Sequence, residues 1–235
     1  PDPGYPDYLS GVSLGRVTYE TFPLTAENDF LPDLDAIPEE TARRAKFIYI
    51  NYPNNPTGAV ATKAFYEKLV AWAKTYEVGV VSDLAYGALG YQGYENPSFL
   101  STPGAKDVGI EFYTFSKTFN MAGWRLAFAA GNDQMIEALN LIQDHLFVGI
   151  FPALQEAGIA ALLDPKSEEA VAQLNATYDS RRDAFVQAAA KIGWQAFPSR
   201  GSFYAWMPVP EGDTSESFAD LLLEKAHVAV APGKG

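Results

Sequence analysis

Cysteine is absent from this sequence of 235 residues, and histidine occurs only twice. A chain without thiols forms no disulfide and carries out no thiolate chemistry. His145 and His227 lie far apart in the sequence and give little support to a metal site, so we interpret both as surface or packing residues. The 17 lysines and arginines are outnumbered by 29 aspartates and glutamates, and the net charge of −12 argues against the basic surface that nucleic acid or anionic lipid requires.

Long apolar stretches are also missing. No run approaches the roughly 20 apolar residues of a membrane-spanning helix, and nothing is typical of a signal peptide. Since 48% of the residues are hydrophobic, we expect a globular, cytoplasmic protein with no membrane partner. The sequence starts at Pro1 without a methionine and stops at Gly235 shortly after an apolar run, so we expect an internal fragment of a longer protein.

What the sequence does contain is an alternation of short apolar runs with helical patterns. Runs that are apolar on both faces and separated by helices are typical of parallel strands buried between helix layers. The sequence therefore predicts an α/β fold with a mostly parallel sheet between helix layers. The predicted strands are residues 46–51, 79–82, 109–115 and 126–130, and the predicted helices are residues 63–76, 132–147 and 152–163.

A break at Asp164-Pro165-Lys166 divides the chain. We expect residues 1–165 to form a large domain whose N-terminal part is missing. Beyond the break, Ser167 is a good first residue for a long helix that runs to about residue 191. A strand-like segment at 201–207 and a helix at 215–225 follow, so we expect residues 166–235 to hold a linking helix and part of a smaller α/β domain.

One lysine stands out from its surroundings. Lys117 lies in Phe112-Tyr113-Thr114-Phe115-Ser116-Lys117-Thr118-Phe119, a run of aromatic residues that also presents hydroxyl groups. An amine among apolar neighbours loses solvation of its charged form, so more of it is available as a neutral nucleophile. A lysine that forms a Schiff base needs this property. The motif is not a nucleotide-binding P-loop, because Ser116 stands where that loop requires glycine.

The stretch from Ser116 to Arg125 resembles the cofactor-lysine segment of fold-type I pyridoxal phosphate (PLP) aminotransferases, where serine-lysine-threonine precedes glycine-tryptophan-arginine. Three more segments similar to this family occur in the family's order, so the resemblance covers most of the chain. It implies that residues 1–165 are a PLP-binding domain and that Lys117 anchors the cofactor and moves the substrate proton.

The second segment, Ser82-Asp83-Leu84-Ala85-Tyr86, follows a buried strand, and ligands of open α/β sheets bind at such strand ends. By resemblance, Asp83 faces the pyridine nitrogen of PLP and Tyr86 its phenolic oxygen. Without the resemblance, Asp83 would be read as the cap of a turn. Asp83, Tyr86 and Lys117 are the predicted catalytic residues.

Two N-terminal loops carry the other family segments. In Asn54-Asn55-Pro56-Thr57-Gly58, the resemblance assigns Asn55 to the ring oxygen of PLP; a plain Asn-Pro turn is the alternative. In Pro3-Gly4-Tyr5-Pro6, it assigns Tyr5 to stacking on the cofactor ring, and an aromatic residue near a Pro-rich turn is otherwise a packing residue.

The phosphate of PLP needs a cation and hydroxyl donors. The resemblance assigns Arg125, whose planar guanidinium can bind two phosphate oxygens, to this task. Thr114 and Ser116 would add their hydroxyls. The family often has serine where Thr114 stands, and threonine keeps the hydroxyl group.

The resemblance implies an aminotransferase that moves an amino group between an amino acid and a 2-oxo acid by a ping-pong Schiff-base mechanism, and a homodimer when full length. It is strongest to the branch of diaminopimelate, alanine, aromatic and methionine-salvage transaminases. Residues 222–233 look nearest to methionine-salvage members. The family's substrate-carboxylate arginine and N-terminal phosphate loop lie outside the chain, so we expect the chain alone to be inactive.

Other functions remain open at this point. A C–S lyase or a decarboxylase of the same fold would use the same lysine and the same cofactor. A non-catalytic PLP-binding regulatory module would carry a DNA-binding domain before Pro1. A bare structural fragment would bind no cofactor at all.

Overall fold

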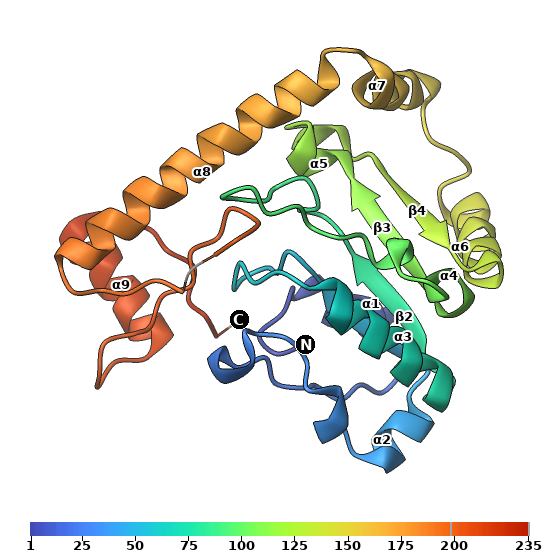
Figure 1. The fold of residues 1–235 in the computed structure, drawn as a ribbon, viewed down its shortest axis with the longest axis horizontal. Helices are drawn as coiled ribbons and strands as arrows, with labels where there is room; N and C mark the ends of the chain where they lie inside the picture. The colour runs from blue at the N-terminus through green and yellow to red at the C-terminus, as the bar shows by residue number, and fades with distance from the viewer. Residues whose placement is uncertain (198, 235) are drawn as a thin grey trace.

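A computed structural model describes residues 1–197 and 199–234 of the chain, and its centre is a sheet of four strands (Figure 1). The strands are β1 (Phe47–Asn51), β2 (Gly79–Asp83), β3 (Gly109–Thr114) and β4 (Ala127–Gly131), in the order β1-β2-β3-β4. The first three strands are parallel, and β4 is antiparallel to β3. The predicted α/β fold with a mostly parallel sheet is confirmed.

One face of the sheet is covered by α3 (Lys63–Tyr76). The helix begins where the Thr62 hydroxyl accepts a hydrogen bond from the Phe65 amide at 3.1 Å, and it ends at Glu77 in the left-handed conformation. Its apolar side packs on the alternate strand residues that point to this face. The main hydrophobic core includes Ile48, Ile50, Tyr66, Leu69, Val80 and Phe99.

The other face is covered in part by α6 (Asp133–Leu146) and, at the carboxyl end of the strands, by α1 (Asp7–Leu14). Gly79 permits the close approach of α6, because a Cβ there would lie 2.6 Å from the terminal carbon of Met135. Tyr8 of α1 packs on Tyr49 of β1, with ring centroids 5.4 Å apart.

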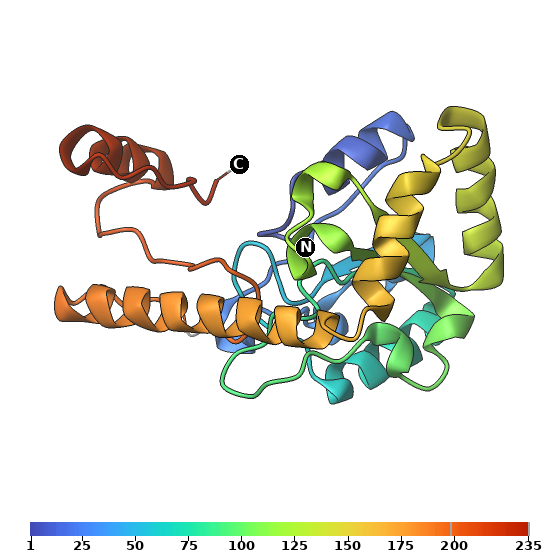
Figure 2. The ribbon, with the colours of Figure 1, turned by 90° about the horizontal axis from the view of Figure 1, so that it is seen from above.

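Two further helices lead away from the sheet (Figures 1 and 2). After α7 (Pro152–Leu163), α8 (Ser167–Lys191) extends beyond the sheet, and α9 (Ser215–Ala226) lies near its far end, where Phe218 packs edge-on against Trp194. None of the helices within the described residues is both long and apolar enough to span a bilayer. The short helices are α2 (Glu39–Arg44), α4 (Ala105–Val108), α5 (Phe115–Thr118) and the 3₁₀ turns η1 (Ala26–Asn28), η2 (Leu34–Ala36), η3 (Phe99–Ser101) and η4 (Ala122–Trp124).

Residues 201–207, which the sequence predicts as a strand, are not one. A single bridge between Gly90 and Gly201 is the only ladder contact that these residues make in the described part of the chain. Residues 201 and 202 instead contact the loop around Gly90 and Tyr91 without forming a strand. The predicted break after α7 is present, since residues 164–166 separate α7 from α8.

Candidate active site

The predicted site residues begin at the carboxyl ends of the parallel strands. Asn51, the last residue of β1, pairs in register with Asp83, the last residue of β2, and Asp83 pairs with Phe112 of β3. Thr114 ends β3 two residues later. Side chains from three strands therefore meet at one edge of the sheet, where open α/β sheets bind their ligands.

Asp83 is largely enclosed at this edge. The Tyr8 hydroxyl donates to Asp83 Oδ2 at 2.6 Å, and the Ala85 amide donates to Oδ1 at 3.1 Å. Burial raises the pKa of Asp83, while the hydrogen bonds from Tyr8 and Ala85 act in the opposite direction. Each carboxylate oxygen keeps a free lone pair, so Asp83 can accept one more donor, such as a protonated ring nitrogen.

Lys117 lies on α5, a single helical turn that follows β3. The Thr114 hydroxyl caps this turn by accepting a hydrogen bond from the Ser116 amide at 3.2 Å. The Lys117 Nζ lies 5.9 Å from the ring centroid of Tyr86 and 5.4 Å from that of Phe203. Among the described residues no ion pair involves Lys117, so its amine is available to a ligand.

Tyr86 connects Asp83 to Lys117. Its ring is buried and its hydroxyl lies 3.3 Å from the Tyr204 hydroxyl. Burial raises the pKa of Tyr86, and the contacts with Tyr204 and Asp83 raise it further. Its hydroxyl therefore stays protonated at neutral pH and can donate a hydrogen bond to an anionic oxygen.

The turn at Asn55 is tied to the same edge. Asn51 donates from Nδ2 to the Asp83 carbonyl at 3.0 Å and accepts from the Asn55 amide at 2.8 Å. Asn54 holds the other end of the turn, because its Oδ1 accepts from both the amide and the hydroxyl of Thr57. Asn55 is half-buried, and its backbone is tied through Asn51 to the backbone of Asp83.

Tyr5 lies at the rim of the cluster. Its side chain is 39% exposed, its hydroxyl donates to Asp7 at 2.6 Å, and its ring meets that of Tyr8 edge-on at 5.6 Å. The hydrogen bond to Asp7 and partial burial raise the pKa of Tyr5. Because the Tyr8 ring that it meets also carries the hydroxyl bound to Asp83, Tyr5 lies one residue away from the enclosed carboxylate.

Of the three residues predicted to bind phosphate, two lie together and one points elsewhere. Thr114 Oγ1 and Ser116 Oγ are 3.0 Å apart, directly before Lys117. The backbone of Arg125 lies beside them, because the Leu126 carbonyl accepts from the Phe115 amide at 3.1 Å. The Arg125 side chain, however, is exposed and donates to the Ala122 carbonyl at 3.3 Å.

Four residues of this cluster were not predicted from the sequence, namely Tyr8, Asn51, Phe203 and Tyr204. Tyr8 follows Tyr5 by three residues, so a helix at this point would have indicated that both rings share a face. Asn51 ends the predicted strand that precedes the strand of Asp83, so its position at a strand end could have indicated a site residue. Phe203 and Tyr204 arrive from beyond α8, and no local pattern places them near Lys117.

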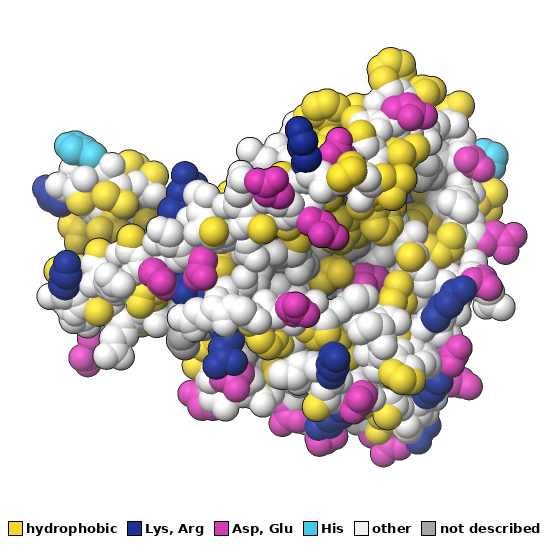
Figure 3. Space-filling view, turned by 45° about the horizontal axis from the view of Figure 1, so that its top comes forward, with side chains coloured by type: hydrophobic (Ala, Val, Ile, Leu, Met, Phe, Trp, Pro, Cys, Tyr) yellow, Lys and Arg dark blue, Asp and Glu magenta, His cyan; other side chains and the backbone are white. Residues whose placement is uncertain are grey.

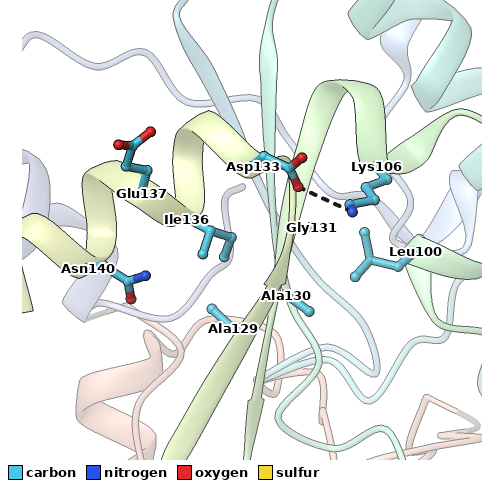
Figure 4. Close-up of a pocket in the computed structure, with 9 residues that line it drawn as sticks. All are labelled: Leu100, Lys106, Ala129, Ala130, Gly131, Asp133, Ile136, Glu137 and Asn140. Carbon is cyan, nitrogen blue, oxygen red and sulfur yellow. Dashed lines mark ion pairs between the residues drawn. The ribbon is translucent and has the colours of Figure 1, made fainter.

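A separate hollow lies at the opposite end of the sheet (Figure 4). It is lined by β4 and α6 residues, and Lys106 and Asp133 form an ion pair of 3.2 Å at its edge. Gly131 in this hollow pairs with Ile110 near the start of β3, so the hollow is remote from Lys117. Since the ion pair is exposed and none of the predicted site residues lines the hollow, we assign no chemistry to it.

Comparison with known proteins agrees with this geometry. The family model for class I and II aminotransferases matches residues 1–235. The L-glutamine--4-(methylsulfanyl)-2-oxobutanoate aminotransferase of Bacillus subtilis is 57% identical over the whole chain, and the LL-diaminopimelate aminotransferase of Moorella thermoacetica is 50% identical. The chain spans 58% and 60% of the length of these two relatives.

Solved structures agree as well. The substrate-bound structure of BacF from Bacillus subtilis superposes with a TM-score of 0.95 at 47% identity. The superposition covers 100% of this chain and 59% of the BacF chain. An aminotransferase from Staphylococcus aureus superposes with a TM-score of 0.96 at 39% identity, and the superposition covers 100% of this chain and 61% of the S. aureus chain. The chain therefore belongs to the class I and II aminotransferase family.

Fold-type I members of this family use PLP, and the described residues suit that cofactor. An unpaired amine, a buried carboxylate with a free lone pair, a protonated phenol and adjacent hydroxyls lie at one strand edge. These are the donors and acceptors that its aldehyde, ring nitrogen, ring oxygen and phosphate require.

Proposed function

We propose that the intact protein is a PLP-dependent aminotransferase that moves an amino group between an amino acid and a 2-oxo acid. The observation that carries the proposal is the Lys117 amine, held against Tyr86 within a cluster that also contains the enclosed carboxylate of Asp83. Membership of the aminotransferase family supports it. The 57% identity to the B. subtilis enzyme named for 4-(methylsulfanyl)-2-oxobutanoate favours that 2-oxo acid as an acceptor to test first.

The roles of the residues follow from their chemistry. When bound, the cofactor supplies an electron sink for the substrate's Cα carbon. Asp83 would hold a proton at the ring nitrogen, and the Tyr86 hydroxyl would donate to the ring oxygen. The Lys117 amine would accept the Cα proton as a general base and return it later as a general acid.

The remaining predicted residues would orient the ligand. Tyr5 would cover one face of the ring, Asn55 would donate from its fixed turn, and Thr114 and Ser116 would donate hydroxyl hydrogen bonds to phosphate. Arg125 joins them only if its side chain leaves the Ala122 carbonyl and turns toward Ser116, which a long, exposed arginine can do.

The proposal includes the organisation of the intact protein. We propose a PLP-binding domain at residues 1–165, followed by a linking helix and part of a smaller domain at 166–235, because residues 164–166 break the chain between α7 and α8. A cytoplasmic homodimer is proposed as well. Amino acids and 2-oxo acids are metabolites of the cytoplasm.

The support for a homodimer is an exposed apolar surface, here called the α6–α7 surface. Figure 3 shows hydrophobic side chains gathered at the end of the molecule where α7 lies. Monomers rarely expose many large apolar side chains in one part of the surface, and a second copy of the chain would cover those around α7. The surface consists of Leu146, Phe147, Val148, Phe151, Leu162 and Leu163.

The decisive experiment uses the full-length protein with PLP. Borohydride reduction followed by peptide mapping should place the cofactor on Lys117, and Lys117→Arg should prevent labelling and lower amino transfer by at least about 10²–10⁴-fold. Release of ammonia or thiol without a 2-oxo acid would instead indicate a lyase. Label on a different lysine would refute the assignment.

A further inference from the structure

A segment that follows α8 in the sequence returns to the candidate site, and we call residues 199–204 the return segment. Figures 1 and 2 show the chain after α8 coming back toward the sheet. Tyr91 holds this segment through two hydrogen bonds, from its amide to the Arg200 carbonyl at 3.0 Å and from its hydroxyl to the Ser202 carbonyl. The Ser199 hydroxyl donates to the Gly201 carbonyl at 2.6 Å and lies 3.2 Å from the Gly58 carbonyl.

Two glycines let the return segment approach the sheet domain this closely. A Cβ at Gly201 would lie 2.6 Å from the ring of Pro53, and a Cβ at Gly58 would overlap the Ser199 side chain. Gly58 also has φ +72°, a conformation that side chains disfavour. The position of the return segment therefore depends on a glycine in the segment itself, Gly201, and on a glycine in the sheet domain, Gly58.

The fixed backbone presents Phe203 to Lys117. The Phe203 ring stacks on Tyr178 of α8 at 5.4 Å, meets Tyr86 edge-on at 5.2 Å and lies 5.1 Å from Tyr204. The Lys117 Nζ is 5.4 Å from its centroid. Although three aromatic rings surround it, Phe203 stays 37% exposed, so part of its ring is open to a ligand.

The distance to Lys117 determines what Phe203 can touch. A substrate whose Cα proton is taken by Lys117 must bring that carbon to about 3–3.5 Å from Nζ. Because the ring centroid is 5.4 Å from the same nitrogen, a side chain that extends from this Cα toward Phe203 can contact the ring. The face of an aromatic ring is electronegative, so it favours apolar groups and thioethers over carboxylates.

We propose that Phe203 is a specificity-determining residue that favours amino acids and 2-oxo acids with apolar or thioether side chains. This inference rests on the proposed aminotransferase function. Tyr178 acts with it as a positioning residue, since its stacked ring limits rotation of Phe203.

The test compares Phe203→Ala and Phe203→Leu in the full-length protein, with one fixed 2-oxo acid and methionine, alanine or glutamate as donor. We expect Phe203→Ala to lower kcat/KM for methionine by about 10–200-fold, the range for a lost hydrophobic contact, mainly through KM. Alanine and glutamate should change by less than about threefold, since their side chains gain little from the ring. Phe203→Leu should restore most of the preference.

Two controls separate this role from a structural one. Phe185→Ala removes a phenylalanine of similar exposure, 42%, which lies on α8 and outside the return segment, and should leave the donor preference unchanged. The dissociation constant of a non-reacting α-methyl methionine, measured by calorimetry, should rise in Phe203→Ala while the affinity for PLP stays the same. Equal losses for all three donors, or no loss for methionine, would overturn the inference. Failure of the wild type with every donor would instead refute the proposed function.

Discussion

At the scale of single residues, the state of Asp83 depends on Tyr8. Burial favours the neutral acid, yet an acid that holds a proton on a ring nitrogen must itself be ionised. The hydroxyl of Tyr8, 2.6 Å from Oδ2, stabilises the ionised form. Tyr8 is itself fixed by the rings of Tyr5 and Tyr49.

Replacing Tyr8 by phenylalanine should therefore weaken cofactor binding. Tyr8→Phe keeps the ring and removes a hydrogen bond to a charged group, worth about 1.5–3 kcal/mol, so the affinity of the cofactor-free full-length protein for PLP should fall by roughly tenfold or more. Fluorescence titration with PLP measures this affinity. Tyr49→Phe is the matched control, because it keeps the ring that packs on Tyr8 and removes a hydroxyl that has no hydrogen bond within the described residues. Equal losses in both variants would count against the role of Tyr8.

The raised pKa of Asp83 also has a cost in stability. Below its ordinary value of 3.8 both folded and unfolded chains are protonated, but between that value and the raised folded pKa the folded chain binds more protons. The free energy of unfolding therefore falls across this interval as pH rises. Asp83→Asn should stabilise the cofactor-free protein at pH 7.5 by roughly 0.5–2 kcal/mol. Urea denaturation should show the gain shrinking toward pH 4, and a gain independent of pH would contradict the argument.

At the scale of elements, a buried acid attaches η3 to the sheet. Glu111 of β3 is 6% exposed and accepts hydrogen bonds from the hydroxyls of Ser82 and Ser98 and, at 2.8 Å, from the Phe99 amide. With three donors the carboxylate is satisfied without a cation. The start of η3 is thus held by Glu111 together with Ser98, whose hydroxyl accepts a hydrogen bond from the Leu100 amide at 3.1 Å.

Glu111→Ala should leave the buried Phe99 amide without its acceptor and lower the free energy of unfolding by about 3 kcal/mol, while Glu111→Gln should lose less, because its carbonyl can still accept. Urea denaturation gives the loss, and hydrogen exchange should show faster exchange at Phe99 in the alanine variant. Equal stability of the two variants would show that the hydrogen bonds matter little.

The elements also show how far the sequence predicts the structure. The start of α3 was predictable because Thr62 is a good cap, and that of α7 because proline favours the first turn. Helix α1 was not predicted, since Gly11 interrupts it and it has no buried residue. Residues 201–207 were predicted wrongly, because a strand-like pattern does not say whether a pairing partner exists.

The candidate site likewise combines residues that local sequence predicts with residues that it does not. Asp83 and Lys117 stand at strand ends, so local sequence predicts their common edge. The contacts of Phe203 and Tyr204 depend on the path of the chain beyond α8 and carry no local signal. The roles of the predicted residues stay a prediction until the experiments above are done.

At the scale of the whole molecule, the α6–α7 surface should decide the oligomeric state. Val148 is 85% exposed and Phe151 is 69% exposed. A glutamate at Phe151 would bury a charge in an interface, which is strongly unfavourable. If the full-length protein is the proposed dimer, Phe151→Glu should convert it to monomer at micromolar concentration, as measured by light scattering after gel filtration. Phe151→Leu keeps the site apolar and should remain dimeric. A monomeric wild type would mean that another part of the intact chain covers this surface.

The route of the return segment sets an order of events during translation. Lys117 and Tyr86 leave the ribosome well before Phe203, because the whole of α6, α7 and α8 is synthesised between them. At about 5–20 residues per second, this interval lasts roughly 4 to 17 s. During that time the nascent chain carries the Lys117 amine without the Phe203 ring that lies 5.4 Å from it in the folded chain, so the proposed selection of side chains can begin only after α8 has been made.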